Sequence, residues 1–289
     1  VSTGKALTTK WDYTVGIVQA VKQLEIEDIR SIEMVSVSTT LATNAIVEGN
    51  TQPVGLLMMN IDNSIPEGIS CFPRNIIKGK TTIQGVVEEE IDTDEILTIA
   101  NTMIKEHEIR AFAVSGYAGT VNPNLEQRVK EILHTHTGMD VCCGHELSGL
   151  LDYTLRANPA VLNAGIIPLL ESFIINLEEA MAHMDINTPI MIVKGDGTLI
   201  STETAKLHPI QTALSGPAAS TAGAKYLTGI SDATIIDVGG TTSDIGIISN
   251  GRISIGNNGV SIGGIATHVR AVDMLTLGIG GDSEIKIEI

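Results

Sequence analysis

Cysteines and aromatic residues are scarce in this sequence. Its 289 residues include 3 Cys, 1 Trp, 4 Tyr and 3 Phe. Cys71 and the adjacent pair Cys142 and Cys143 are odd in number, and their spacing matches neither a zinc site nor a disulfide framework. We therefore expect reduced thiols, mostly buried in strands, in a cytoplasmic protein whose core is built from Ile, Val, Leu and Ala.

Basic residues and long apolar runs are scarce too. The sequence has 18 Lys and Arg against 34 Asp and Glu, which gives a formal charge of −16. This charge argues against nucleic acid as a general partner, because phosphate backbones need neutralising Lys and Arg. The longest uninterrupted apolar stretches, such as residues 54–59, are far shorter than the roughly 20 residues that span a bilayer. Since no secretory signal opens the chain either, we expect no membrane partner.

The hydrophobic pattern predicts an α/β protein. Strand-like runs alternate with helix-like periodicity, which is typical of βα units and mixed sheets. With 43% hydrophobic residues, the chain can bury a sizeable core and divide into two domains. The pattern predicts helices over 14–24, through 45 to 49, from 93 or 94, over 122–134 and over 218–227, and strands over 34–37, 54–59, 111–114, 140–143, 190–193, 245–249 and 252–255. Residues 152–184 should be helical in segments, because Pro159 and Pro168 break or kink a helix.

The most informative segment is DVGGTTSD at residues 237–244, which lies between two β-branched runs. The pattern predicts a β-hairpin whose glycines let the backbone turn. Its tip would present N–H groups and hydroxyls to phosphate oxygens, and a carboxylate on either side would hold a hydrated Mg²⁺. The residues concerned are Asp237, Gly239, Gly240, Thr241, Thr242 and Asp244. The alternative is an ordinary hairpin with a polar tip.

This hairpin resembles the second phosphate-binding hairpin of the actin-like ATPase superfamily, which includes sugar kinases, the 70-kDa chaperones and the hydantoinase/oxoprolinase A subunits. Other motifs look like the hydantoinase/oxoprolinase A family in the same order along the chain. They are TTLATNAIVEG at 39–49, SGY at 115–117, HE at 145–146 with Arg156 and Asn163, GDG at 195–197, LSGPA at 214–218 and GIGGDS at 278–283. The resemblance covers nearly the whole chain.

The resemblance implies an α/β fold of two ribonuclease-H-like lobes, with mixed sheets flanked by helices and the nucleotide between the lobes. We expect the first lobe over residues 1–187 and the second over 188–289, with a linker near 185–189. Family members normally carry a first phosphate hairpin before the part that matches the start of this chain, and they continue well beyond residue 283. We therefore expect an internal fragment, natural or trimmed, that lacks half of the phosphate clamp.

Three stretches are candidates for substrate contacts. Thr40, Thr43 and Asn44 follow a predicted strand where a helix begins, so their side chains either face a ligand or simply cap the helix. His145 and Glu146 follow the strand over 140–143 and serve either in proton transfer or substrate binding, or as plain surface residues.

Arg156 either pairs with a substrate carboxylate or makes a structural salt bridge. The loop over 278–283, with Gly280 and Gly281, is a substrate, interlobe or nucleotide loop; residue 278 comes 34 positions after Asp244 (278 minus 244).

Ser215 begins either a ligand-facing turn or an interlobe hinge. The histidines at 107, 134, 136, 183, 208 and 268 form no metal pattern, and we expect no site role for them.

The family resemblance implies an ATP- and Mg²⁺-dependent enzyme that opens a small cyclic amide, such as a hydantoin or 5-oxoproline. ATP would phosphorylate the ring carbonyl oxygen so that water can open the ring, with Asp237 holding the hydrated Mg²⁺ and Asp244 assisting. A hydantoinase B-type subunit is the expected partner, and a homo-oligomer is possible. Two alternatives stay open: a sugar- or acid-kinase-like phosphotransferase, and a non-catalytic actin-like nucleotide switch.

Overall fold

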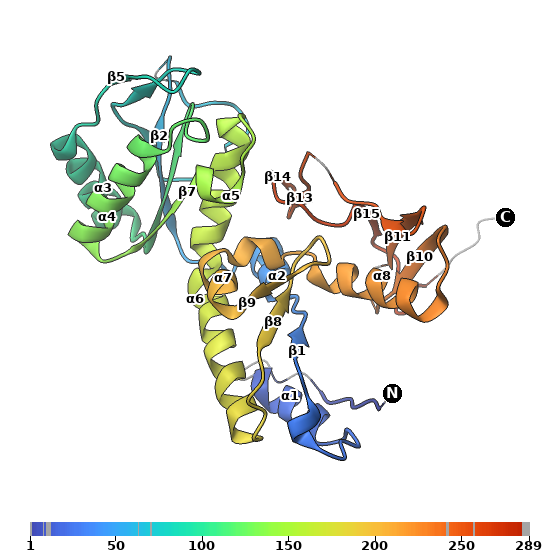
Figure 1. Cartoon of the computed structure of the whole chain (residues 1–289). Coiled ribbons are helices and arrows are strands. Elements are labelled where there is room, and N and C mark those ends of the chain that lie inside the picture. The colour runs from blue at the N-terminus through green and yellow to red at the C-terminus, as the bar shows by residue number, and fades with distance from the viewer. Residues whose placement is uncertain are drawn as a thin grey trace.

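The predicted α/β class is confirmed by a chain that contains helices and several separate sheets (Figure 1). The computed structural model of the protein describes residues 2–7, 9, 13–62, 64–69, 71–240, 243–256 and 258–284. Thr241 and Thr242, the predicted phosphate-binding threonines, lie outside these residues.

The first sheet is four-stranded and wholly parallel. Its strands, in order across the sheet, are β3 (Arg74–Ile76), β2 (Val54–Met59), β6 (Ala111–Gly116) and β7 (Asp140–Cys143). β2 and β6 are buried along their whole length, as expected of parallel strands that are covered on both faces. Helices α3 (Thr93–His107) and α4 (Asn124–Thr137) pack on one face, and α6 (Tyr153–His183) packs on the other. A small antiparallel pair, β4 (Lys80–Thr81) and β5 (Val87–Glu89), lies beyond β3 along the chain.

The second sheet joins two distant parts of the sequence. Its strands are β1 (Val35–Val37), β8 (Ile190–Val193) and β9 (Leu199–Ser201), with β1 parallel to β8. Around it lie α1 (Tyr13–Val21), η1 (Ile29–Ser31), α2 (Leu41–Glu48), α7 (Thr202–Leu207) and η2 (Pro209–Thr212). The division predicted at residue 187 stays a prediction. Residues before and after position 187 pack together, because β1 and β8 share one sheet and one core cluster.

Helix α6 packs against both the first and the second sheet. It runs unbroken over 31 residues, so the prediction of a helix in segments was wrong. An interior proline costs about 3 kcal/mol, but each fully buried apolar side chain returns roughly 1.5–3 kcal/mol, and α6 buries such side chains on both sides of Pro159 and Pro168. Within the described residues, α6 has the length and composition to cross a membrane, yet 56% of its most apolar window is buried inside this fold, as in a core helix.

The third sheet contains the predicted hairpin. Its strands are β10 (Ala233–Val238), β11 (Ser243–Ser249), β12 (Arg252–Ile253) and β15 (Met274–Leu277), all antiparallel to their neighbours. Asn250 and Gly251 form the turn between β11 and β12 with positive φ at both residues, which confirms the predicted pairing of these strands. Helix α8 (Ser215–Thr228) packs on this sheet, and the short pair β13 (Ser261–Ile262) and β14 (Ile265–Ala266) lies toward α2 (Figure 1).

The three cysteines are free thiols. Cys142 and Cys143 are buried in β7 as predicted, and burial raises the pKa of Cys142 to about 12. Cys71 lies outside the strands and is half-buried, so the expectation of a strand position was wrong for this residue. Because burial keeps Cys142 protonated near neutral pH, it behaves as a small apolar core residue.

Candidate functional site

The two aspartates of the hairpin stand directly opposite each other. Asp237 on β10 pairs in register with Asp244 on β11, and Asp244 in turn pairs with Thr276 on β15. Residues in direct cross-strand register lie on the same face of a sheet, so these three oxygen-bearing side chains form one row. The Thr276 hydroxyl donates to Asp244 Oδ1 at 2.6 Å, while Asp237 is exposed to solvent.

The loop over residues 278–283 lies against the hairpin tip. Gly281 N donates to Gly239 O at 2.8 Å, and Asp282 N donates to Gly240 O at 2.8 Å. A Cβ on Gly280 would lie 2.5 Å from Gly240 O, closer than real Cβ atoms approach backbone oxygens, so only glycine fits there. Two glycine-rich motifs about forty positions apart in sequence therefore lie against each other, and the choice between a substrate, interlobe or nucleotide loop stays a prediction.

A cavity of about 340 Å³ adjoins the row of side chains. Its lining comes from the hairpin sheet, the start of α8 and the segment between β12 and β15: Leu214, Pro217, Asp244, Gly259, Val260, Ser261, Val272, Asp273, Met274 and Thr276. Carboxylate and hydroxyl oxygens are the donors that a hydrated Mg²⁺ prefers, and the row of Asp237, Asp244 and Thr276 supplies only these. The donor set fits a hydrated Mg²⁺.

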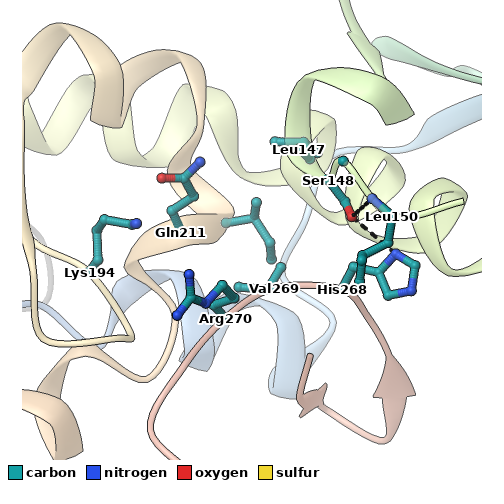
Figure 2. Close-up of a pocket in the computed structure, with 10 residues that line it drawn as sticks. Leu147, Ser148, Leu150, Lys194, Gln211, His268, Val269 and Arg270 are labelled. Carbon is teal, nitrogen blue, oxygen red and sulfur yellow. Dashed lines mark hydrogen bonds between the residues drawn. The ribbon is translucent and has the colours of Figure 1, made fainter. Parts of the chain in front are cut away.

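A second cavity, of about 500 Å³, lies where the loop between α5 (Gly144–Leu147) and α6 meets the segment after β14 (Figure 2). Its lining residues are Leu147, Ser148, Gly149, Leu150, Lys194, Ile210, Gln211, His268, Val269 and Arg270. His268, which we expected to have no site role, is buried and shares a hydrogen bond of 3.1 Å between its Nδ1 and Ser148 Oγ. Sequence inspection missed this pair, because its members are 120 positions apart.

The predicted threonines at the start of α2 hold the start of α8. Thr43 Oγ1 accepts a hydrogen bond from Leu214 N at 2.9 Å, and Ser215 Oγ donates to Thr39 O at 2.9 Å. Leu214 has φ of 61°, a left-handed conformation that is uncommon for a leucine and stands at the edge of the 340 Å³ cavity. Thr40 accepts from Asn44 Nδ2 at 3.2 Å. Substrate binding by Thr40, Thr43 and Asn44 stays a prediction. The contacts of Thr43 with Leu214 and of Thr39 with Ser215 join segments that are far apart in sequence.

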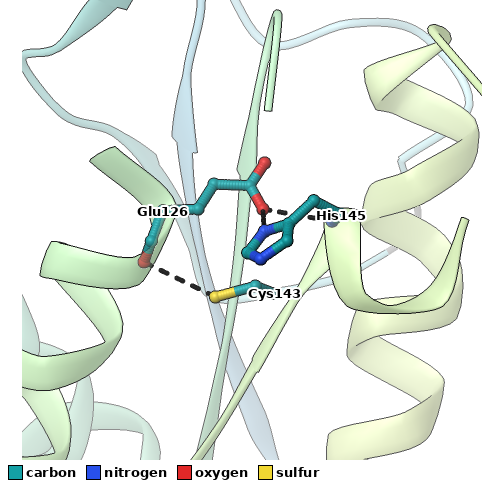
Figure 3. Close-up of side chains that lie close together, drawn as sticks. All are labelled: Glu126, Cys143 and His145. Atoms are coloured by element: carbon teal, nitrogen blue, oxygen red, sulfur yellow. Dashed lines mark hydrogen bonds and ion pairs between the residues drawn. The ribbon is translucent and has the colours of Figure 1, made fainter. Parts of the chain in front are cut away.

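His145 pairs with a carboxylate other than its neighbour (Figure 3). His145 Nδ1 lies 2.5 Å from Glu126 Oε2, whereas Glu146 receives the Lys130 ammonium at 2.6 Å. Sequence inspection missed Glu126, because it lies on α4, 19 positions before His145, with no motif around it. The substrate roles of His145 and Glu146 stay predictions, and both side chains have partners within the fold.

Glu126, Cys143 and His145 bring three potential metal-ligand atoms within 4.8 Å of one another. The carboxylate of Glu126 already has three partners: it accepts from Gly116 N at 2.7 Å, His145 N at 3.1 Å and the His145 ring. The Cys143 thiol donates to Glu126 O at 3.5 Å, and burial raises its pKa. These contacts describe a closed internal network that ties α4 to β7 and α5.

Arg156 is completely buried at the start of α6. Its Nη1 donates to Leu150 O at 2.6 Å, and its Nη2 donates to Gly116 O at 2.6 Å. Within the part of the chain that is described, no carboxylate forms a salt bridge with it. The predicted role in holding a substrate carboxylate stays a prediction, and this geometry gives it no support, because the guanidinium binds backbone carbonyls instead.

We expect Arg156→Met to destabilise the fold strongly. The substitution leaves the carbonyls of Leu150 and Gly116 without their charged donor, and each such hydrogen bond contributes roughly 1.5–3 kcal/mol. Arg128→Met is the matched control, since Arg128 is exposed and its ion pair with Glu90 should contribute less than about 1 kcal/mol. Urea unfolding of both variants measures the difference; equal stability of the two would contradict the structural role.

The hairpin with its apposed glycine loop defines a class: an α/β protein in which two glycine-rich segments meet beside paired carboxylates on an antiparallel sheet. Residues 1–137 match the family model of the hydantoinase/oxoprolinase N-terminal region, and residues 156–289 match the hydantoinase/oxoprolinase model. The chain belongs to the hydantoinase/oxoprolinase family.

Relatives are distant in sequence. The chain is 23% identical to the caprolactamase subunit alpha of Pseudomonas jessenii over 96% of its own length and 44% of that protein, and 24% identical to an uncharacterised protein of Methanocaldococcus jannaschii over 85% and 40%. An acetone carboxylase solved without nucleotide is similar in fold, with a TM-score of 0.83, 18% identity and coverage of 96% and 44%. The ATP-dependent caprolactamase structure from Pseudomonas jessenii has a TM-score of 0.70, 21% identity and coverage of 91% and 42%. The chain thus spans less than half the length of the relatives it matches.

Proposed function

We propose that this chain is the nucleotide-binding part of an ATP-dependent enzyme with an actin-like, two-lobed ATPase fold. The observation that carries the proposal is the apposition of the loop over 278–283 to the hairpin tip, next to the in-register carboxylates of Asp237 and Asp244. The ATP-dependence named for the caprolactamase and acetone carboxylase relatives supports the same conclusion.

The proposed reaction is the ring opening of a small cyclic amide, such as a hydantoin or 5-oxoproline. An unactivated lactam resists water, and bound Mg-ATP would supply the phosphoryl group that activates its carbonyl oxygen. Asp237 would hold the water shell of the metal and Asp244 would assist, with its orientation fixed by Thr276. Gly239, Gly240, Gly280 and Gly281 would let phosphate oxygens approach the backbone closely.

A second subunit and a cytoplasmic setting belong to the same proposal. The caprolactamase relative is named as a subunit alpha, so a B-type subunit that completes ring opening is the partner we propose. An acidic, cysteine-poor chain with free thiols is compatible with a reducing compartment.

The test is phosphate release from Mg-ATP by the protein that carries this chain, with and without a B-type subunit. Hydantoins, 5-oxoproline, neutral lactams and acetone with bicarbonate form the panel. We expect stimulation by one cyclic amide together with formation of its ring-opened acid. A stable phosphorylated product would instead indicate a kinase-like phosphotransferase, and slow ATP hydrolysis that no compound stimulates would indicate a nucleotide switch.

A further inference from the structure

The 500 Å³ cavity carries unusual charge for this protein. Among its lining residues are the cations Lys194 and Arg270, and no carboxylate. Lys194 Nζ lies 3.2 Å from Asp196 Oδ2, so its charge is partly balanced. Arg270 is exposed and makes no ion pair or side-chain hydrogen bond within the described residues. In a chain with a net charge of −16, an arginine with unused donors at a cavity points to an anionic ligand.

The opposite side of the cavity carries a polar pair (Figure 2). Ser148 Oγ accepts a hydrogen bond from Leu150 N at 3.1 Å and lies 3.1 Å from His268 Nδ1. Burial lowers the pKa of His268, so its imidazole is neutral near pH 7. No partner binds its Nε2 within the described part of the chain. A neutral imidazole with one occupied nitrogen can donate or accept a hydrogen bond at its other nitrogen, and an uncharged polar group of a ligand can be the partner.

Hydrogen bonds hold the walls of this cavity in place. Gly195 N donates to Gln211 O at 2.8 Å, Val272 N donates to Gly195 O at 2.8 Å and Val260 N donates to Val269 O at 3.1 Å. A Cβ on Gly195 would lie 2.2 Å from Ala213 O, which shows how closely these segments approach. A volume of about 500 Å³ lies within the range of about 300–1,000 Å³ that is usual for small-molecule sites. The cavity is therefore formed before any ligand enters.

The two cavities share their supporting segments. Gln211 and Arg270 line the larger cavity. Leu214 and Val272, which follow them closely in sequence, line the smaller one. A ligand in the larger cavity would consequently contact residues only two or three positions along the chain from the walls of the cavity beside Asp244.

We propose that this cavity binds a small molecule bearing an oxyanion, a carboxylate or a phosphate. Arg270, with Lys194, holds the oxyanion, and the Ser148–His268 pair hydrogen-bonds the uncharged polar end of the ligand. This site is separate from the hairpin. A carboxylate ligand such as 5-oxoproline rests on the proposed function, in which this compound is a candidate substrate, whereas occupancy of the cavity is measured without ATP.

Titration calorimetry of the protein without nucleotide tests the proposal with three probes. 5-Oxoproline and 2-pyrrolidinone are a matched pair that differs only in the carboxylate, and inorganic phosphate represents the other source of an oxyanion. We expect 5-oxoproline to bind at least about 10-fold more tightly than 2-pyrrolidinone, a difference of about 1.4 kcal/mol. Arg270→Gln should remove that advantage. Arg252→Gln, which removes the same charge from exposed β12 outside the cavity lining, should keep it.

The outcomes separate as follows. Binding of 5-oxoproline that depends on Arg270 supports the site and identifies a carboxylate ligand; binding of phosphate alone that depends on Arg270 supports the site and identifies a phosphate ligand. Three results would overturn the proposal. The first is equal affinity for 5-oxoproline and 2-pyrrolidinone with no phosphate binding, the second is unchanged affinities in Arg270→Gln, and the third is no binding of any probe. His268→Gln should lower the affinity for every probe that binds the cavity, without altering the preference for an anion. ATP turnover is measured separately, so a failure here leaves the proposed function intact.

Discussion

Asp237→Asn is expected to remove ATP turnover almost completely while leaving the fold intact. The substitution keeps the shape of the side chain and its place opposite Asp244, but it removes the negative charge that would order the metal's water shell. Loss of one such preorganised electrostatic group commonly lowers kcat by about 100- to 1,000-fold. Phosphate release from Mg-ATP, measured beside thermal unfolding of the same sample, gives both quantities.

The fold should tolerate this change because Asp237 is exposed and makes no side-chain hydrogen bond within the described residues. Asp140→Asn provides the control: it removes one negative charge from an exposed strand position far from the hairpin in sequence. We expect normal turnover and an unchanged Tm in that variant. Full turnover in Asp237→Asn would remove the basis for placing the nucleotide at this hairpin, and a large fall in its Tm would assign Asp237 a structural role instead.

Local chemistry explains why the hairpin could be predicted from sequence. Ala233–Val238 and Ser243–Ser249 are rich in β-branched residues and are separated by a short glycine-containing stretch, so the signal lies within 17 positions (233 to 249). The same holds for β8 (Ile190–Val193), whose predicted bounds are those observed. Where propensity and pattern agree over a short stretch, the sequence alone determines the element.

Long-range packing explains what could not be predicted. The continuity of α6 through Pro159 and Pro168 depends on two sheets that are built partly from residues more than a hundred positions before the helix. Glu126 meets His145, and Ser148 meets His268, only after the chain has folded. Such contacts have no local signature, because a buried polar side chain finds its partner by three-dimensional proximity.

The candidate site depends on both local sequence signals and long-range packing. Each of its glycine motifs is visible in the sequence, but their contact is not, since it depends on β15 pairing with β11 and bringing residue 278 back to the hairpin tip. Ser243 Oγ fixes this return by donating to Ile279 O at 2.6 Å. The structure shows that the loop contacts the hairpin tip, and a glycine substitution can test whether nucleotide binding needs this contact.

Gly280→Ala should weaken Mg-ATP binding by at least about 10-fold, which corresponds to about 1.4 kcal/mol. The new methyl group would lie 2.5 Å from Gly240 O and 2.7 Å from Gly239 O. Both are backbone atoms that cannot move aside cheaply, so the loop must retreat from the hairpin tip and lose the hydrogen bonds of Gly281 and Asp282. Equilibrium binding of a fluorescent ATP analogue with Mg²⁺ measures the effect.

Gly278→Ala is the matched control, because its added methyl group would meet no heavy atom within 4 Å and no phosphate contact is proposed for Gly278. The two variants make the same chemical change two positions apart in one loop, and neither position belongs to a hydrophobic core cluster. A loss of affinity confined to Gly280→Ala ties nucleotide binding to the contact between loop and hairpin tip. Equal affinities in the two variants would show that the nucleotide does not need this contact, and the loop would then be reassigned to the substrate or to the interface between lobes.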